Sequence, residues 1–66
     1  MARVMVRLLP GGEERALEAG TVRELLTKLG GDTESYVVLR DGRPLLPGER
    51  LREGDSLVVV RVLSGG

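Results

Sequence analysis

The residues with the clearest chemical potential are the last two, Gly65 and Gly66. They follow an apolar run, Leu57 to Leu63, that has the composition of a strand. Glycine has no side chain to pack and loses the most backbone entropy on ordering, so two terminal glycines add little to a fold. They can thread a narrow slot and leave a terminal carboxylate accessible. Once an enzyme converts such a carboxylate to an acyl-adenylate, sulfur or an amine can attack it. The alternatives are chance, given 10 glycines in 66 residues, and a cloning scar.

The amino-acid composition argues against an active site contained in this chain. There is no histidine and no cysteine, which removes the commonest general base and the thiolate ligands of metals. The serines therefore have no imidazole partner for a catalytic triad. The glycine pairs at 11–12 and 30–31 lack the spacing and the lysine of a phosphate-binding loop. We expect a protein that is not an enzyme and that holds no metal and no permanent cofactor.

Charge and hydropathy limit the partners and the location. The 10 basic residues balance the 10 acidic ones, whereas nucleic-acid binders usually carry a basic excess on one face. A single aromatic residue, Tyr36, leaves no stacking platform for single strands. No segment resembles a signal peptide, and no apolar run reaches transmembrane length. The expectation is a cytoplasmic monomer that contacts neither nucleic acid nor membrane directly.

The first half of the chain changes from a strand-like to a helical period. Alternating residues at Arg3–Leu9 predict a half-buried strand, and Pro10–Gly12 predicts a turn. Glu13–Glu18 is a weaker, highly charged strand that suits a sheet edge. A helix of roughly two turns should follow, because apolar residues recur on one helical face at Val22, Leu25, Leu26 and Leu29.

The ends of this helix carry recognisable signals. Thr21 is a good N-cap, and Glu24 three residues later completes a capping box. Gly30 or Gly31 can adopt the left-handed conformation that ends a helix. Since a helix this short is marginal alone, it must be held by packing against a sheet.

The second half of the chain predicts three strands. Tyr36–Arg40 and Arg43–Leu46 flank Asp41-Gly42, a strong hairpin signal. Ser56–Leu63 is apolar over most of its length, so we expect it in the centre of the sheet.

The order strand, strand, helix, strand, strand, strand favours an α+β roll of the β-grasp type. The first and last strands would lie adjacent and parallel in a mixed sheet of four to five strands, with the helix packed across one face. Residues 1–63 form the domain in this interpretation, and residues 64–66 form a flexible diglycine tail.

Three segments resemble the ubiquitin-like sulfur-carrier proteins, a family that includes the thiazole-synthesis carrier, the small subunit of molybdopterin synthase, and the tRNA-thiolation carriers with the archaeal small modifiers. The segments are the helix start Gly20–Leu26, the hairpin Val37–Gly42, and the closing signature, which runs from Leu51–Asp55 through the apolar strand to Ser64-Gly65-Gly66. The chain departs from the pattern at Arg40, where many thiazole carriers have asparagine.

The resemblance implies a carrier whose partners supply the catalysis. A ubiquitin-activating-like adenylyltransferase would use ATP to adenylate Gly66, with Ser64 and Gly65 threading into that enzyme. A persulfide on a sulfurtransferase or cysteine desulfurase would then displace AMP and leave a thiocarboxylate on Gly66. A downstream thiolating enzyme would pass this sulfur to a cofactor precursor or a tRNA uridine, and the choice among thiamine, molybdopterin and tRNA pathways stays open.

Two other functions are compatible with the same residues. The activated end could acylate protein lysines, as in a ubiquitin-like modifier. A second copy of this chain would have to be attached to Lys28, the one lysine, or to the N-terminus. A β-grasp domain could instead be a non-covalent interaction module, because the fold hosts both kinds of protein.

The alternation of the last strand predicts a docking face for the activating partner. Successive residues of a strand point to opposite sides of a sheet, so one set packs on the helix and the other lies on the open face. We assign five apolar residues to that open face as the partner-binding surface: Met5, Leu39, Val58, Val60 and Val62. The sequence leaves open which face Val37, Val38 and Leu39 point to. An apolar patch of this size can mark an interface, and cover by a loop is the alternative.

Overall fold

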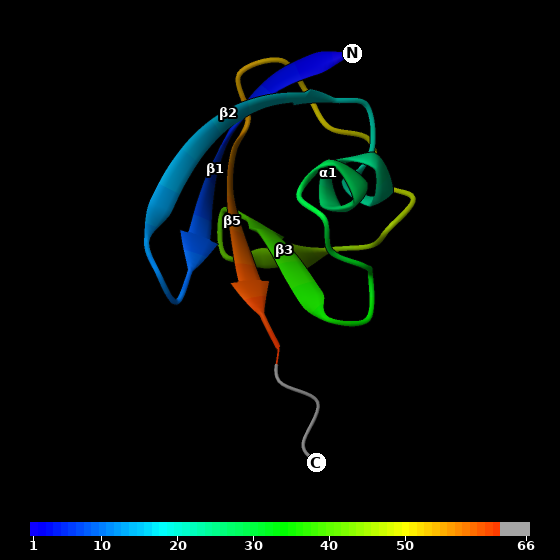
Figure 1. The fold of residues 1–66 in the computed structure, drawn as a ribbon. Coiled ribbons are helices and arrows are strands. Elements are labelled where there is room, and N and C mark those ends of the chain that lie inside the picture. The colour runs from blue at the N-terminus through cyan, green and yellow to red at the C-terminus, as the bar shows by residue number, and fades with distance from the viewer. Residues whose placement is uncertain (63–66) are drawn as a thin grey trace.

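A five-stranded sheet curves around one helix in the computed structural model, which describes residues 1–62 (Figure 1). Along the chain the elements are β1 (Ala2–Leu9), β2 (Glu13–Ala19), α1 (Val22–Lys28), β3 (Tyr36–Arg40), β4 (Arg43–Leu45) and β5 (Ser56–Arg61). These bounds agree with the sequence prediction to within a residue or two at each end. Leu63, the predicted last residue of the final strand, lies outside the described residues.

The strand order β2-β1-β5-β3-β4 confirms the mixed β-grasp sheet. β1 and β5 are parallel neighbours in the centre, and every other pairing is antiparallel. The charged strand β2 and the proline-containing strand β4 lie at the two edges, as expected from the missing amide of proline and from the need to protect an edge.

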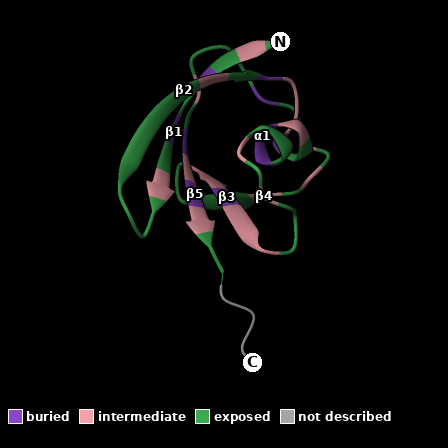
Figure 2. Ribbon diagram, viewed as in Figure 1, coloured by how far each residue is buried: buried purple, intermediate pink, exposed green. Residues whose placement is uncertain are grey.

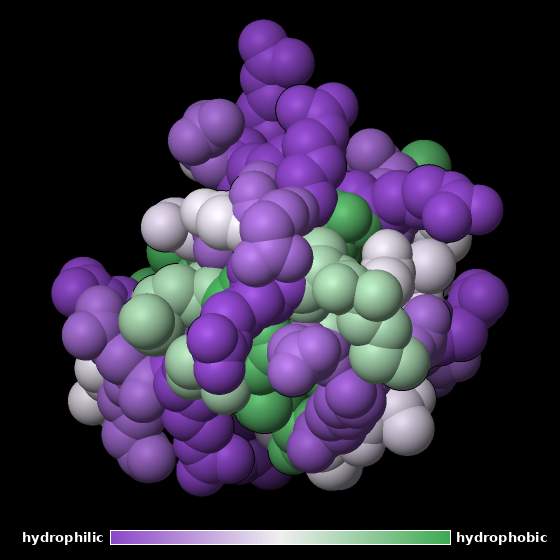
Figure 3. All heavy atoms as spheres, turned by 90° about the horizontal axis from the view of Figure 1, so that it is seen from above, coloured by the Kyte–Doolittle hydropathy of each residue, from purple (hydrophilic) through white to green (hydrophobic). Residues whose placement is uncertain are grey.

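The inner face of the sheet and one face of α1 enclose the hydrophobic core, whereas much of β2 is exposed (Figure 2). The buried residues form one cluster: Val4, Val6, Ala19, Val22, Leu25, Leu26, Val38, Leu51, Leu57 and Val59. Leu29, the fourth residue of the predicted helix face, is only partly buried against this cluster. Seen from above, hydrophilic side chains surround a limited area of hydrophobic atoms (Figure 3).

Backbone carbonyls of a distant loop satisfy the first amides of α1. Thr21 is the N-cap, and its hydroxyl accepts from the amide of Glu24 at 3.2 Å. The amides of Val22 and Arg23 donate to the carbonyls of Glu49 and Pro47 at 3.1 and 2.9 Å. These bonds supply partners for amides that a helix leaves free at its start. They also fasten the loop before β5 to the helix.

The end of α1 is closed by two glycines in a Schellman arrangement. Gly30 has a φ of 81°, so it is the left-handed residue, and its amide donates to the carbonyl of Thr27 at 3.0 Å. The amide of Gly31 donates to the carbonyl of Leu26 at 2.9 Å. The ring of Tyr36 packs directly over Gly31, at the position where a Cβ atom would otherwise stand.

Gly31 should therefore be the least replaceable glycine of the helix terminus. The Cβ atom of a Gly31→Ala variant would overlap the Tyr36 ring, which must shift within a packed cluster. We expect a loss of about 1–3 kcal/mol in the free energy of unfolding, the usual cost of overpacking, measured by chemical denaturation.

Gly48→Ala is the matched control, because a Cβ atom at Gly48 meets nothing within 4 Å and its φ is not positive. This variant should be neutral or stabilised by up to about 1 kcal/mol through the unfolded chain. Equal stability of the two alanine variants would show that Tyr36 does not constrain Gly31.

Candidate functional site

The sheet face opposite α1 carries a group of apolar side chains, here named the open-face patch. The register pairs Leu39 with Val58, and it aligns Val37 and Leu9 with Val60 on either side of β5. Met5 and Val62 point to the same side, because each is an even number of residues away from Leu9 or Val60 along its own strand. The patch therefore consists of Met5, Leu9, Val37, Leu39, Val58, Val60 and Val62. All five residues assigned to the open face from the sequence are members.

The patch is accessible rather than covered among the residues that the structure describes. Met5, Leu9 and Val62 are 47%, 36% and 44% exposed, and the other four residues are half-buried by their neighbours. In contrast, Leu57 and Val59 point to the helix and are 2% and 0% exposed. This arrangement suits a protein partner, although partner binding by these residues stays a prediction.

Two members of the patch, Leu9 and Val37, were missed as site residues by the sequence reasoning. The signal for Leu9 was present, because it shares the phase of Met5 in an alternating strand. Val37 lies in the unbroken apolar run of β3, which has no alternation. Its face became known only from its pairing with Val60.

A charged pair interrupts the apolar side chains of the patch, because Arg7 lies between Met5 and Leu9 on β1 and pairs with Val58. Arg7 and Glu14 form an ion pair of 3.3 Å, with both side chains 57% exposed. A shallow hollow of about 240 Å³ lies between this pair and the side chains of Met5 and Val58. An ion pair this exposed stabilises the fold little, so its main effect is to place charged groups beside the apolar side chains of β1 and β5.

The end of β5 is tied to the loop before β3. The amide of Val62 donates to the carbonyl of Ser35 at 2.7 Å, one residue beyond the last β3–β5 pair, Tyr36 with Arg61. The predicted reactive residue Gly66 and the threading residues Ser64 and Gly65 lie outside the described residues.

The loop before β3 is organised by one carboxylate. Oδ1 of Asp32 accepts from the amides of Glu34 and Ser35, at 3.0 and 2.8 Å. The Ser35 amide, then the Ser35 hydroxyl and the Glu34 amide, lower the pKa of Asp32 from its ordinary value by stabilising the ionised form.

Lys28, the predicted acceptor for a second copy, has its amine engaged in the structure. Nζ of Lys28 donates to the carbonyl oxygen of Glu18 and lies 3.9 Å from the sulfur of Met1. The residue remains exposed. Its role as an acceptor stays a prediction.

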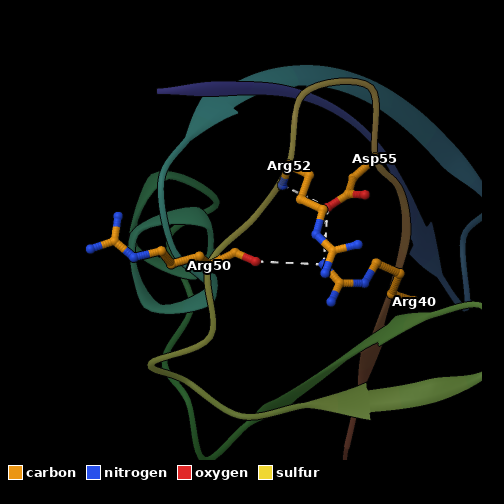
Figure 4. A network of polar contacts seen from close by, with 4 residues as sticks. All are labelled: Arg40, Arg50, Arg52 and Asp55. Atoms are coloured by element: carbon orange, nitrogen blue, oxygen red, sulfur yellow. Dashed lines mark hydrogen bonds and ion pairs between the residues drawn. The ribbon is translucent and has the colours of Figure 1, made fainter.

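Arg40 and Asp55 explain the Gly-Asp part of the closing signature (Figure 4). Oδ2 of Asp55 accepts from the amide of Arg52 at 2.8 Å and pairs with Nη1 of Arg40 at 3.2 Å. Arg50 contributes its backbone carbonyl, 3.5 Å from Nη1 of Arg40, while its side chain points away. The arginine that departs from the thiazole-carrier pattern therefore fixes the turn before β5.

A family comparison covers the chain from Val6 to Gly66, which includes the two C-terminal glycines and every member of the open-face patch except Met5. The model of the ThiS family matches residues 6–66. The chain belongs to the ThiS family. A curated relative, the sulfur carrier protein ThiS of Thermus thermophilus, is 36% identical over 59 residues, which cover 83% of this chain and 92% of the relative. Membership in the ThiS family supports a role as a sulfur carrier.

Solved structures with the same fold include a ubiquitin and an archaeal protein. The Caldiarchaeum subterraneum ubiquitin superposes with a TM-score of 0.75 at 22% identity and covers 98% of both chains. SAMP1 from Haloferax volcanii superposes with a TM-score of 0.73 at 21% identity, covering 98% of this chain and 100% of the other. At these identities the likeness establishes the ubiquitin-like fold of this ThiS-family chain and nothing about its chemistry.

Other kinds of site find no support within residues 1–62. No group of three or more acidic residues lies close enough to hold a metal ion in this part of the chain. No helix among the described residues is long and apolar enough to cross a membrane. These observations leave the open-face patch and the end of β5 as the candidate site of this ThiS-family protein.

The lowered pKa of Asp32 predicts how its loop responds to acid. Because the pKa is lower in the folded than in the unfolded chain, the carboxylate stabilises the fold above the unfolded-state value of about 3.9, and this contribution is lost as the pH falls through the folded-state pKa. We expect the unfolding free energy of the wild type, relative to Asp32→Asn, to be constant above about pH 5 and to decrease below about pH 4.

Denaturant titrations of both proteins between neutral and strongly acidic pH measure this difference, and NMR of the Asp32 carboxyl carbon gives the pKa directly. A difference that does not change with pH would mean that the two amides do not bind the ionised carboxylate in solution.

Proposed function

We propose that this protein carries sulfur as a thiocarboxylate on Gly66, formed after a ubiquitin-activating-like adenylyltransferase has adenylated that residue. The observation that carries the proposal is the ThiS family match, which continues through residue 66 and so includes the two glycines. The 36% identity to a sulfur carrier protein over most of both chains supports it further.

The proposed chemistry takes place in two stages at the same carboxylate. An oxygen of Gly66 attacks the α-phosphorus of ATP, and pyrophosphate leaves. The terminal sulfur of a persulfide, held by a sulfurtransferase or cysteine desulfurase, then attacks the acyl carbon and AMP leaves. The product is an acyl disulfide that keeps the sulfur–sulfur bond of the persulfide. A thiol then attacks the sulfur that belongs to the sulfurtransferase or desulfurase and forms a disulfide with it, and the thiocarboxylate leaves for a downstream thiolating enzyme in cofactor or tRNA thiolation.

The carrier in this proposal is a substrate and not a catalyst. The chain has no histidine and no cysteine, so it offers neither the usual base for proton transfer nor a thiol that could carry the persulfide. ATP binds to the activating partner, and the carrier holds no cofactor of its own. The same lack of cysteine prevents the chain from intercepting its own acyl-adenylate as an internal thioester.

The open-face patch serves as the docking surface for the adenylyltransferase in this proposal. Its members from β5 end with Val62, four residues before Gly66. A fully extended chain spans about 3.3–3.6 Å per residue, so a partner bound on the patch has the carboxylate within about 14 Å of its edge. The half-buried valines would contribute apolar contact area, and the exposed Arg7–Glu14 pair would offer polar contacts beside Met5 and Val58.

The first test is the intact mass of the protein after incubation with a lysate of the source organism, ATP and a sulfur donor. Wild-type protein should gain the mass that corresponds to one oxygen replaced by sulfur. A variant that lacks Gly66 should show no gain, because its terminal carboxylate then lies on Gly65, one residue short of the position at which the activating enzyme would adenylate it.

Two outcomes would contradict the proposal in different ways. Heavier species that only peptide-bond cleavage resolves would identify a protein modifier conjugated through Gly66. No ATP-dependent change, with the activating enzyme shown to be present, would favour a non-covalent interaction module.

The docking surface is tested with Val60→Arg. Val60 is half-buried in the middle of the patch, and arginine can extend into solvent there without entering the core. We expect the melting temperature to change little and kcat/KM for adenylation to fall roughly tenfold or more, since about one apolar side chain is lost from the interface. ATP–pyrophosphate exchange with the purified adenylyltransferase measures the rate.

Leu46→Arg is the matched control for this variant. Leu46 is 70% exposed and follows β4, outside the open-face patch. The Leu46→Arg substitution introduces the same charge at an apolar surface position, and it should leave kcat/KM for adenylation unchanged. Equal rates for Val60→Arg and wild type would place the docking surface elsewhere.

A further inference from the structure

Met5 is the most exposed member of the open-face patch, and the strand register explains why. On β1 it pairs with Ala16 of β2 on one side and with Ser56 of β5 on the other. Residues paired in this way lie side by side on the same face of a sheet. Both neighbours have short side chains, which leave the longer thioether side chain of Met5 uncovered, so that Met5 is 47% exposed.

Two shallow hollows of the surface share Met5 in their lining. The hollow beside the Arg7–Glu14 pair has a volume of about 240 Å³. A second hollow, of about 200 Å³, is lined by Met5 together with residues of β1 and β2 and with the turn at residues 53–55. Met5 is the one residue of the described chain that lines both. Small solutes can therefore approach its side chain from either hollow.

The composition of the chain directs oxidants to methionine. There is no cysteine, histidine or tryptophan, and there are 2 methionines, so the thioethers of Met1 and Met5 are the groups that a hydroperoxide oxidises most readily. The sulfur attacks one peroxide oxygen, the oxygen–oxygen bond breaks, and the proton of the attacked oxygen passes to the leaving oxygen. The sulfur becomes a sulfoxide by losing two electrons, and the hydroperoxide is reduced to an alcohol or water.

A sulfoxide at Met5 would change the surface without changing the core. Val4 and Val6, the neighbours on the same strand, point to the helix and are 2% and 0% exposed, whereas Met5 lies on the open face. The new oxygen can stay hydrated in the free protein. A partner that covers Met5 has to remove water from this hydrogen-bond acceptor, which weakens binding unless the partner donates to it.

We propose that Met5 is an oxidation-sensitive site on the docking surface: its conversion to the sulfoxide by a hydroperoxide weakens docking of the adenylyltransferase and slows the adenylation of Gly66. This inference rests on the proposed function, because it assigns a modification to the open-face patch. Met1 provides an internal comparison. It is 77% exposed and precedes β1, and its sulfur lies 3.9 Å from Nζ of Lys28, outside the patch.

The test uses the wild type, Met5→Leu and a chain that lacks Met1, each before and after treatment with hydrogen peroxide. Leucine keeps an apolar side chain of similar volume and cannot form a sulfoxide. Intact mass and peptide mapping should show two added oxygen atoms in the wild type and one in each of the other two proteins. The melting temperature of each protein should not change on treatment.

Adenylation is then measured by ATP–pyrophosphate exchange with the purified adenylyltransferase, which is added after the peroxide has been removed. Each protein is compared with its own untreated sample. We expect kcat/KM to fall roughly tenfold or more in the wild type and in the chain that lacks Met1, and to stay the same in Met5→Leu. Treatment of the oxidised wild type with methionine sulfoxide reductases and a thiol should restore the rate, because the sulfoxide oxygen is then removed as water.

Three results would overturn the inference. They are a Met5 that stays unoxidised while Met1 is oxidised, an oxidised wild type with an unchanged rate, and an equal loss of rate in oxidised Met5→Leu. If the untreated wild type is not adenylated, the proposed function itself fails and the inference falls with it, so the untreated and treated samples separate the two failures.

Discussion

The parallel pairing of β1 and β5 is the constraint on which the other elements depend. Two parallel strands cannot be joined by a tight turn, and here residues 10–55 make the connection. The pairing of Met5 with Ser56 through Leu9 with Val60 places both strands in the centre of the sheet. One face is then covered by α1, and the other is left with the apolar side chains of two central strands and no element of the described chain to cover them.

The register of this pairing is set by the turn before β5. The amide of Gly54 donates to the carbonyl of Arg3, and the amide of Met5 donates to the carbonyl of Asp55, both at 2.9 Å. The Asp55 carboxylate holds the turn through Arg52 and Arg40, in an ion pair whose side chains are mostly shielded from solvent. A one-residue slip would exchange the core and open faces of β5, so these few polar contacts maintain both the apolar packing and the position of the open-face patch.

Local signals made most of the fold predictable. Asp41 and Gly42 do take the two positive φ values, 53° and 79°, that their hairpin turn requires, and Thr21 caps the helix as expected. The sequence did not reveal that the carbonyls of Pro47 and Glu49 accept from the first amides of the helix. Every residue has a backbone carbonyl, so the pattern of side chains does not indicate which carbonyls form such bonds. The hydrogen bond between the Val62 amide and the Ser35 carbonyl was not predicted for the same reason. In contrast, the residues on the open face of β5 could be predicted from the alternation of the strand alone.

The arrangement of β5 also limits how its length can change. Leu57 and Val59 occupy one phase of the strand, and Val58, Val60 and Val62 occupy the other. The insertion or deletion of a single residue after Leu57 would reverse the phase of everything that follows and turn the surface valines inward. Changes in steps of two would keep the phase and move the end of the strand by about 6.5–7 Å. Within this strand the reach of the C-terminus can therefore change only in steps of two residues, whereas a change of one residue has to arise after Val62.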